Sequence, residues 1–143
     1  MSDYPVLEPG ARFDERGVRV RRGGCSCGAV RFELRGEPTV VGLCHCLECR
    51  KATGAVAMAY ADWPREAFTL RGEAREYVGR SFCSTCGSRL FHLQAHRVEV
   101  LLGALDEGPS DLQPTREGWI IRREPWLAAV AGAEQAERDP SPH

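Results

Sequence analysis

The feature that most constrains this chain is the dense run of thiols in Cys44-His45-Cys46-Leu47-Glu48-Cys49. Three cysteines within six residues supply more soft ligand than a fold of this size needs for packing alone. Thiolates are ligands that zinc prefers in proteins, and the thiolate is also the reactive form of the side chain. We therefore interpret this run as the site of chemistry.

The chain holds seven cysteines in three groups. The groups are Cys25 and Cys27, then Cys44, Cys46 and Cys49, then Cys83 and Cys86. Seven is odd, so a disulfide framework would leave one thiol unpaired. The first residues also lack the basic start and apolar core of a secretory signal. These observations favour metal binding in a cytoplasmic protein.

Counting ligands gives one natural partition of the cysteines. A structural zinc site takes four protein ligands, whereas a catalytic site takes three and keeps one position for water or substrate. Four plus three accounts for all seven thiols and predicts two zinc ions per chain. The closed site would use Cys25, Cys27, Cys83 and Cys86, and the open site would use Cys44, Cys46 and Cys49.

Two alternatives stay open on the sequence. The CxxC pairs at 46–49 and 83–86 are zinc knuckles that would close one zinc ribbon together and leave the other three cysteines scattered. In the second alternative all seven thiols are buried without metal. The first partition is favoured over that reading because inert core cysteines have no reason to recur at ligand spacing.

Length and charge limit the classes of function. The 143 residues suggest one domain, and 19 Lys plus Arg against 20 Asp plus Glu give a formal net charge of −1. Such a balance creates no positive field for a nucleic acid backbone, and no apolar run approaches the roughly 20 residues of a membrane span. We expect a weakly ordered arm over 1–16, a zinc-binding domain over 17–130 and a flexible tail over 131–143.

Apolar and polar residues alternate over many short segments, which predicts half-buried antiparallel strands. The predicted strands are 18–21, 30–34, 39–43, 55–60, 89–93 and 98–102, with a hairpin around Gly72 and an edge strand at 119–121. A helical turn at 50–53 should end at Gly54. The fold class expected is mainly β, with packed antiparallel sheets, zinc knuckles and little helix.

Several motifs resemble those of the glutathione-dependent formaldehyde-activating enzyme family, also called the centromere protein V domain family. They are Gly24-Cys25-Ser26-Cys27-Gly28, Cys44-His45-Cys46-Leu47-Glu48-Cys49-Arg50-Lys51 with Gly54-Ala55, Phe82-Cys83-Ser84-Thr85-Cys86-Gly87 with Leu90-Phe91, Gly103-Ala104-Leu105-Asp106, and Pro125-Trp126-Leu127. Their order and number make the resemblance much more specific than any single CxxC.

The resemblance implies an Mss4-like fold and carbon–sulfur lyase chemistry. It implies that Cys25, Cys27, Cys83 and Cys86 hold a structural zinc, and that Cys44, Cys46 and Cys49 hold the catalytic one. The reaction it implies is the condensation of glutathione with formaldehyde to S-hydroxymethylglutathione. Where many members carry His-Ile-aromatic, this chain has Glu117-Gly118-Trp119. Either this carboxylate replaces the histidine as proton acceptor or the substrate differs.

Residues beside the open site are candidates for substrate contacts. Arg50 and Lys51 would receive the carboxylates of an acidic thiol such as glutathione, or form a solvated basic pair on the surface. Glu48 is interpreted as a solvent-facing spacer rather than an acid or base. His45 is expected to orient neighbours or transfer a proton rather than to ligate metal, because adjacent residues in an extended turn point apart.

Three functions compete on the sequence. The leading hypothesis is a zinc-dependent lyase that acts on an adduct of a small thiol and an aldehyde. The second is a non-catalytic zinc-ribbon module that binds a protein partner. The third is a thiol redox protein that uses a CxxC pair without metal.

Overall fold

The computed structural model describes residues 11–142, and short strands make up most of this range. The strands are β1 (Arg12–Phe13), β2 (Arg19–Gly24), β3 (Arg31–Arg35), β4 (Val40–Cys44), β5 (Met58–Pro64), β6 (Phe68–Arg71), β7 (Arg75–Tyr77), β8 (Arg80–Phe82), β9 (Arg89–Leu93), β10 (Arg97–Leu101), β11 (Arg116–Gly118) and β12 (Glu134–Gln135). The helical elements are α1 (Leu47–Thr53) and the 3₁₀ turns η1 (Arg65–Ala67), η2 (Leu102–Ala104) and η3 (Ile120–Arg122). Within the described range, no helix combines the length and apolar character that a membrane crossing requires.

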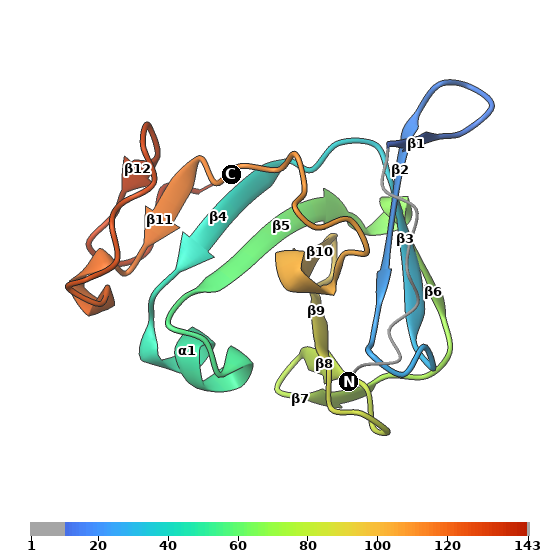
Figure 1. Cartoon of the computed structure of the whole chain (residues 1–143), viewed down its shortest axis with the longest axis horizontal. Helices are drawn as coiled ribbons and strands as arrows, with labels where there is room; N and C mark the ends of the chain where they lie inside the picture. Colours follow the sequence, from blue (N-terminus) through green and yellow to red (C-terminus); the bar gives the residue numbers. More distant parts are fainter. Residues whose placement is uncertain (1–10, 143) are drawn as a thin grey trace.

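The strands form two sheets, as Figure 1 shows. A four-stranded sheet has the order β1-β2-β3-β6, and an eight-stranded sheet has the order β12-β11-β4-β5-β10-β9-β8-β7. The prediction of a mainly β fold is thus confirmed. Antiparallel pairing dominates, as expected, and β11 adds two parallel pairings, one to β4 and one to β12.

The core lies between the two sheets and follows the alternation of the strands. Val98 and Val100 of β10 and Trp63 of β5 are fully buried on one face of the eight-stranded sheet. Phe32 of β3 meets Phe91 of β9 edge to face, with ring centroids 6.0 Å apart. Such aromatic contacts add to the free energy of area burial, so they help fix how the sheets pack.

The opposite face of the eight-stranded sheet carries a row of ionisable residues. Because side chains alternate along a strand, Glu99 points away from the face that buries Val98 and Val100. The strand register places Glu99 opposite Asp62 of β5 and opposite His92 of β9, and it places His92 opposite Arg80 of β8. Strand β5 and the consecutive strands β8, β9 and β10 therefore bring four ionisable side chains into one line.

The segment that follows the strands departs from the prediction at Trp119. The strand there is β11, which ends at Gly118, and Trp119 adopts a left-handed conformation with φ 56° before η3 begins. The edge strand predicted at 119–121 is therefore wrong, since a left-handed residue breaks an extended run. The helix also begins three residues earlier than predicted, at Leu47, while its end at Gly54 is confirmed.

Both ends of the described range make contacts with the domain. Arg12 and Phe13 pair with β2 within the predicted arm, whereas residues 1–10 lie outside the described residues. Within the predicted tail, Glu134 and Gln135 pair with β11, and the Trp119 indole donates a hydrogen bond to Asp139. The boundaries expected at 16 and 130 stay predictions.

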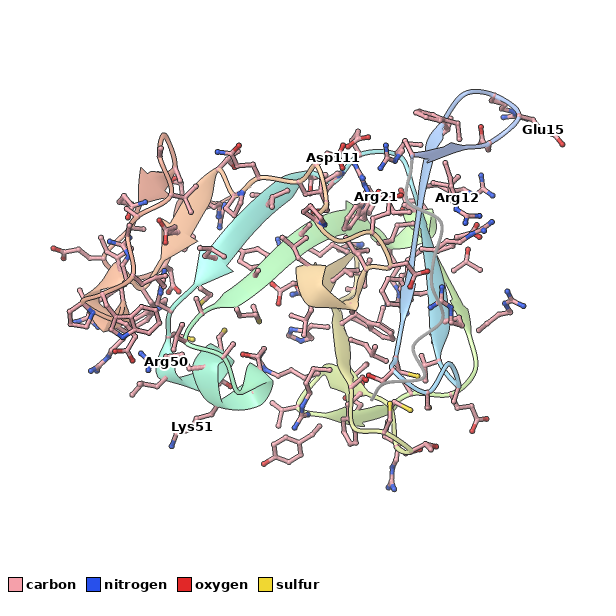
Figure 2. The ribbon with its side chains drawn as sticks, viewed as in Figure 1. Arg12, Glu15, Arg21, Arg50, Lys51 and Asp111 are labelled. Carbon is pink, nitrogen blue, oxygen red and sulfur yellow. The ribbon has the colours of Figure 1, made fainter. Side chains whose placement is uncertain are left out.

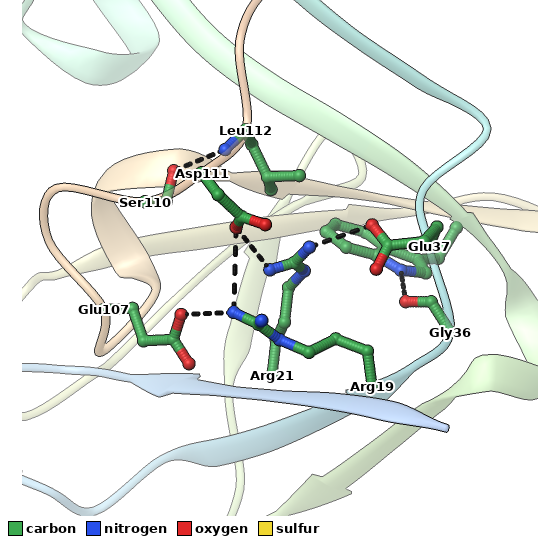
Figure 3. A network of polar contacts seen from close by, with 9 residues as sticks. Arg19, Arg21, Gly36, Glu37, Glu107, Ser110, Asp111 and Leu112 are labelled. Carbon is green, nitrogen blue, oxygen red and sulfur yellow. Dashed lines mark hydrogen bonds and ion pairs between the residues drawn. The ribbon is translucent and has the colours of Figure 1, made fainter. Parts of the chain in front are cut away.

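A buried arginine ties the loop between β10 and β11 to the four-stranded sheet (Figure 3). Arg21 is 2% exposed and donates at 2.9 Å to Asp111 and at 2.9 Å to Glu37. Beside it, Arg19 donates to Glu107 at 2.6 Å. Because a buried guanidinium is costly unless paired, these carboxylates determine where the loop can lie.

We predict that Asp111→Ala lowers the free energy of unfolding by about 1 to 2 kcal/mol, because it leaves one side of the buried Arg21 guanidinium without its partner. Urea denaturation at neutral pH measures the change. The control is Glu15→Ala, which removes an exposed carboxylate from the β1–β2 turn and should change stability by less than about 0.5 kcal/mol. Equal effects of the two substitutions would contradict the anchoring role.

Candidate metal centre

Four cysteines gather where the two sheets meet. Cys25 follows β2 of the four-stranded sheet, and Cys83 follows β8 of the eight-stranded sheet. Their sulfurs lie within 4.8 Å of one another together with those of Cys27 and Cys86. We call this group the four-cysteine cluster. Because its members come from both sheets, an ion bound here would join them.

The sulfur distances of this cluster match a tetrahedral zinc site. The Cys25 and Cys27 sulfurs are 3.6 Å apart, and those of Cys27 and Cys83 are 3.7 Å apart. Zinc–sulfur bonds of about 2.3 Å in a regular tetrahedron separate the sulfurs by about 3.8 Å. The donor set and its spacing therefore fit zinc.

Backbone and hydroxyl groups around this cluster favour thiolates. The amide of Val30 donates to the Cys25 sulfur at 3.2 Å. Hydrogen bonds from the Ser88 hydroxyl and backbone lower the pKa of Cys86 to about 5. Gly87 closes the second knuckle with φ 76°, and its amide donates to the carbonyl of Cys83 at 2.8 Å. The tight positive-φ bend expected of a zinc knuckle is present.

Three further cysteines gather at the start of α1. Cys44 is the last residue of β4, Cys46 caps the helix, and Cys49 lies in its first turn. The sulfurs lie within 4.8 Å of one another, and the Cys49 amide donates to the Cys46 sulfur at 3.3 Å. We call this group the three-cysteine cluster. The left-handed Gly54 ends the short helix and holds its last turn.

The structure thus separates the cysteines into four and three, as ligand counting favours. Among the described residues, the rival pairing of Cys46 and Cys49 with Cys83 and Cys86 does not occur. The ligand roles of the seven cysteines stay predictions, and both donor sets suit a soft metal such as zinc.

An arginine from the eight-stranded sheet reaches the three-cysteine cluster. Arg80 of β8 donates to the Cys49 sulfur at 3.6 Å and contacts the Met58 sulfur at 3.6 Å. A hydrogen bond from the Cys44 thiol, joined by that from Arg80, lowers the pKa of Cys49 to about 5 against the effect of burial. A cation beside sulfur ligands offsets the negative charge that they bring to a metal.

A histidine and a glutamate are buried behind the three-cysteine cluster. His45 and Glu117 are both 0% exposed, and His45 Nε2 lies 2.8 Å from Glu117 Oε1. The other carboxylate oxygen accepts hydrogen bonds at 2.8 Å from the Val130 amide and from Gln135 Nε2. Arg123 completes an ion pair with Glu117 at 3.4 Å.

This arrangement decides what Glu117 can do. Its hydrogen bonds from Gln135, His45 and Val130 lower its pKa despite the opposing effect of burial. Both oxygens are occupied, so the carboxylate orients His45 rather than accepting a proton from a substrate. His45 is absent from the group of sulfur ligands, and its Nδ1 atom is buried without a hydrogen-bond partner.

Arg50 and Lys51, the two basic residues that follow Cys49 on α1, have different surroundings (Figure 2). Arg50 donates to the carbonyl of Arg122 at 2.8 Å and forms an ion pair with Glu124. Lys51 is exposed, as is Glu48. Arg50 therefore holds the C-terminal segment against α1, and of the two predicted substrate contacts Lys51 is the one that faces solvent.

A small pocket opens beside the three-cysteine cluster, between α1 and the strands β5, β8, β9 and β10. Met58 and Leu101 line it and also pack against the cluster. Glu99 lies in its wall, and burial, together with the charges of Asp62 and Cys49, raises the pKa of Glu99 to about 7. Sequence reasoning missed this residue, although an acidic side chain inside an apolar strand was a signal.

We predict that Glu117→Ala lowers the free energy of unfolding by about 2 to 4 kcal/mol, because it leaves the fully buried His45 ring without its partner and removes the hydrogen bonds from Gln135 and Val130. Thermal or urea unfolding of the metal-loaded protein measures the loss. The matched control, Glu137→Ala, removes an exposed glutamate from the same C-terminal segment and should have little effect. A small effect of Glu117→Ala would contradict its bracing role.

Two comparisons with known proteins identify the family of this chain. A curated protein of Halomonas elongata with the provisional name "glutathione-dependent formaldehyde-activating enzyme" is 28% identical over 130 residues, which cover 79% of this chain and 82% of the relative. The sequence model of the family described as "Glutathione-dependent formaldehyde-activating enzyme" matches residues 20–122, which include all seven cysteines. The chain therefore belongs to the glutathione-dependent formaldehyde-activating enzyme family.

Proposed function

We propose that this protein is a zinc-dependent carbon–sulfur lyase that joins a small thiol to an aldehyde and also catalyses the reverse reaction. The observation that carries the proposal is the inequality of the two clusters, four sulfurs in one and three in the other. A four-sulfur site is coordinatively complete, whereas a three-sulfur site keeps a position for a ligand from solution. The proposed protein ligands are therefore Cys25, Cys27, Cys83 and Cys86 for the structural ion, and Cys44, Cys46 and Cys49 for the catalytic ion.

Zinc at the three-cysteine cluster would bind the sulfur of a substrate thiol and keep it as a thiolate near neutral pH. The residues around the cluster suit this guest. Arg80 contributes positive charge beside Cys49, which offsets the addition of one more anionic sulfur. His45, held by Glu117, supports the turn between Cys44 and Cys46 from behind.

The family membership and the name of the relative support glutathione and formaldehyde as the substrate pair. Glutathione carries two carboxylates, and the exposed Lys51 next to the cluster is the proposed contact for one of them. Arg50 would join it only by exchanging its ion pair with Glu124. Seven thiols without a disulfide suit a reducing compartment, and we place the activity in the cytoplasm on that ground.

We predict that the two clusters respond differently to loss of one sulfur. Cys25→Ser or Cys86→Ser should yield unfolded or insoluble protein, because a structural zinc contributes roughly 10 to 16 kcal/mol, comparable to the stability of a whole domain. Cys46→Ser should yield a folded protein with one zinc per chain and no lyase activity. Metal analysis, circular dichroism and an activity assay distinguish these results.

Two outcomes would contradict the assignment. Equal loss of folding in all three variants would show that the three-cysteine cluster is also structural. A wild-type protein with a single, non-exchangeable zinc would instead favour a module that binds a protein partner without catalysis.

We further predict that glutathione raises the melting temperature of the wild-type protein, because it would bind only the folded state. At a concentration 100-fold above the dissociation constant the shift should be roughly 5 to 10 °C for a domain of this size. S-methylglutathione, which has no free thiol, is the matched control and should give a much smaller shift. Equal shifts with both compounds, or an equal shift in Cys46→Ser, would contradict coordination through sulfur.

A further inference from the structure

The pocket beside the three-cysteine cluster is not required for binding a thiol. It lies between α1 and four strands of the eight-stranded sheet, and Met58 and Leu101 both line it and pack against the cluster. Arg80 lines the pocket and also donates to the Cys49 sulfur. A molecule in the pocket would therefore lie next to a thiol that is bound at the cluster.

One carboxyl group is placed to act on such a molecule. Glu99 lies in the pocket wall, where the strand register sets it between Asp62 of β5 and His92 of β9. Its neighbours on the strand, Val98 and Val100, are fully buried on the other face, so the sheet fixes the direction of its side chain. Glu99 is the acidic residue among those that line the pocket. Of the other glutamates near the cluster, Glu117 is held in hydrogen bonds with His45 and the C-terminal segment, and Glu48 is exposed.

We propose that this pocket receives the aldehyde and that the Glu99 carboxyl group donates a proton to the carbonyl oxygen as the carbon–sulfur bond forms. The proposal rests on the proposed function and assigns the second substrate and the proton donor of that same site. In the reverse direction the Glu99 carboxylate takes the hydroxyl proton back as the carbon–sulfur bond breaks.

The step balances without any further reagent. An electron pair of the substrate thiolate forms the bond from sulfur to the carbonyl carbon, and the π pair of the carbonyl moves to its oxygen. That oxygen takes the proton of Glu99, which gives the neutral hydroxyl of the adduct and leaves a carboxylate. The thiol released a proton to water when it bound, and the carboxylate takes one proton back from water. The net reaction therefore consumes one thiol and one aldehyde and yields one adduct.

The walls of the pocket indicate the class of aldehyde. Met58, Phe91 and Leu101 supply apolar surface, and the pocket is small. Arg80 and Arg89 also line the pocket, and Arg80 is engaged by the Cys49 sulfur. We therefore assign a short aldehyde to this pocket.

The charges around Glu99 keep its proton available near neutral pH. Asp62 from β5 and Cys49 from α1 raise its pKa together with burial, whereas Arg80 from β8 and Arg97 on its own strand oppose them. His92 from β9 faces it as well, and burial lowers the pKa of that histidine, so it is neutral in the same range. A carboxyl group with a pKa of about 7 suits general acid catalysis at neutral pH.

The test compares Glu99→Gln with Glu48→Gln in the zinc-loaded protein. Glu99→Gln keeps the shape of the side chain but has no acidic proton, and it should lower kcat for adduct formation by about 10² to 10⁴-fold. Glu48→Gln removes an exposed carboxylate from α1 and should leave kcat unchanged. The adduct is followed by exchange NMR with glutathione and formaldehyde.

Four readouts separate this role from a structural one. Zinc content and the melting shift with glutathione should be the same in Glu99→Gln as in wild type. The wild-type rate of adduct formation should fall as pH rises through about 7, where Glu99 ionises, and Glu99→Gln should lose this dependence. The infrared band of a protonated carboxyl group should be present at neutral pH in wild type and Glu48→Gln, and absent from Glu99→Gln.

Three results would overturn the proposal. Equal rates for Glu99→Gln and Glu48→Gln would remove Glu99 from the reaction, while the lyase function would stand. Loss of zinc or of glutathione binding in Glu99→Gln would show a structural role instead. A wild-type protein that binds glutathione but forms no adduct would overturn the proposed function itself, and the role of Glu99 with it.

Discussion

Repulsion between thiolates is the constraint on which the rest of this structure depends. Four cysteine sulfurs lie within 4.8 Å of one another at the junction of the two sheets, and four negative charges so close would drive the strands apart. The cluster is stable only when protons or a cation offset that charge. Cys25 follows β2 and Cys83 follows β8, so an ion bound between them would both relieve the repulsion and join one sheet to the other.

The three-cysteine cluster is supported by different means. Its sulfurs come from one short stretch, so it does not join distant elements, and its surroundings hold it in place instead. His45 is fixed from behind by Glu117, Arg50 binds the C-terminal segment, and Arg80 approaches from the far end of the eight-stranded sheet. These contacts fix the position of the three cysteines without a fourth sulfur in the cluster. A site that need not hold the fold together is free to exchange a ligand.

Much of this organisation was readable from the sequence, and the reason lies in local chemistry. Ligand spacing and an odd count separated the cysteines, and alternation along β3 and β10 gave their inward faces. The parallel pairing of β11 was missed because nothing local at 116–118 announces a partner in β4. Trp119 misled for a related reason, since an aromatic residue favours a strand but here adopts a left-handed conformation.

The residues around the three-cysteine cluster were also hard to predict, because their contacts join residues far apart in the sequence. Arg50 was expected to contact a substrate or to lie solvated on the surface, but its partner Glu124 lies 74 residues away in the chain and no spacing rule connects them. Glu99 escaped attention because its importance comes from the strands on either side of it. A residue's chemistry is readable from its neighbours in sequence only when those are also its neighbours in space.

The shortness of β8 has a consequence for how the two cysteine clusters are related. This strand begins at Arg80, which touches the three-cysteine cluster, and Cys83 of the four-cysteine cluster follows directly after its end. Three peptide units thus connect Arg80 to Cys83, with an irregularity in the strand pairing between Ser81 and Phe82. The two clusters are therefore linked along the chain by a few residues, although their sulfurs form separate groups.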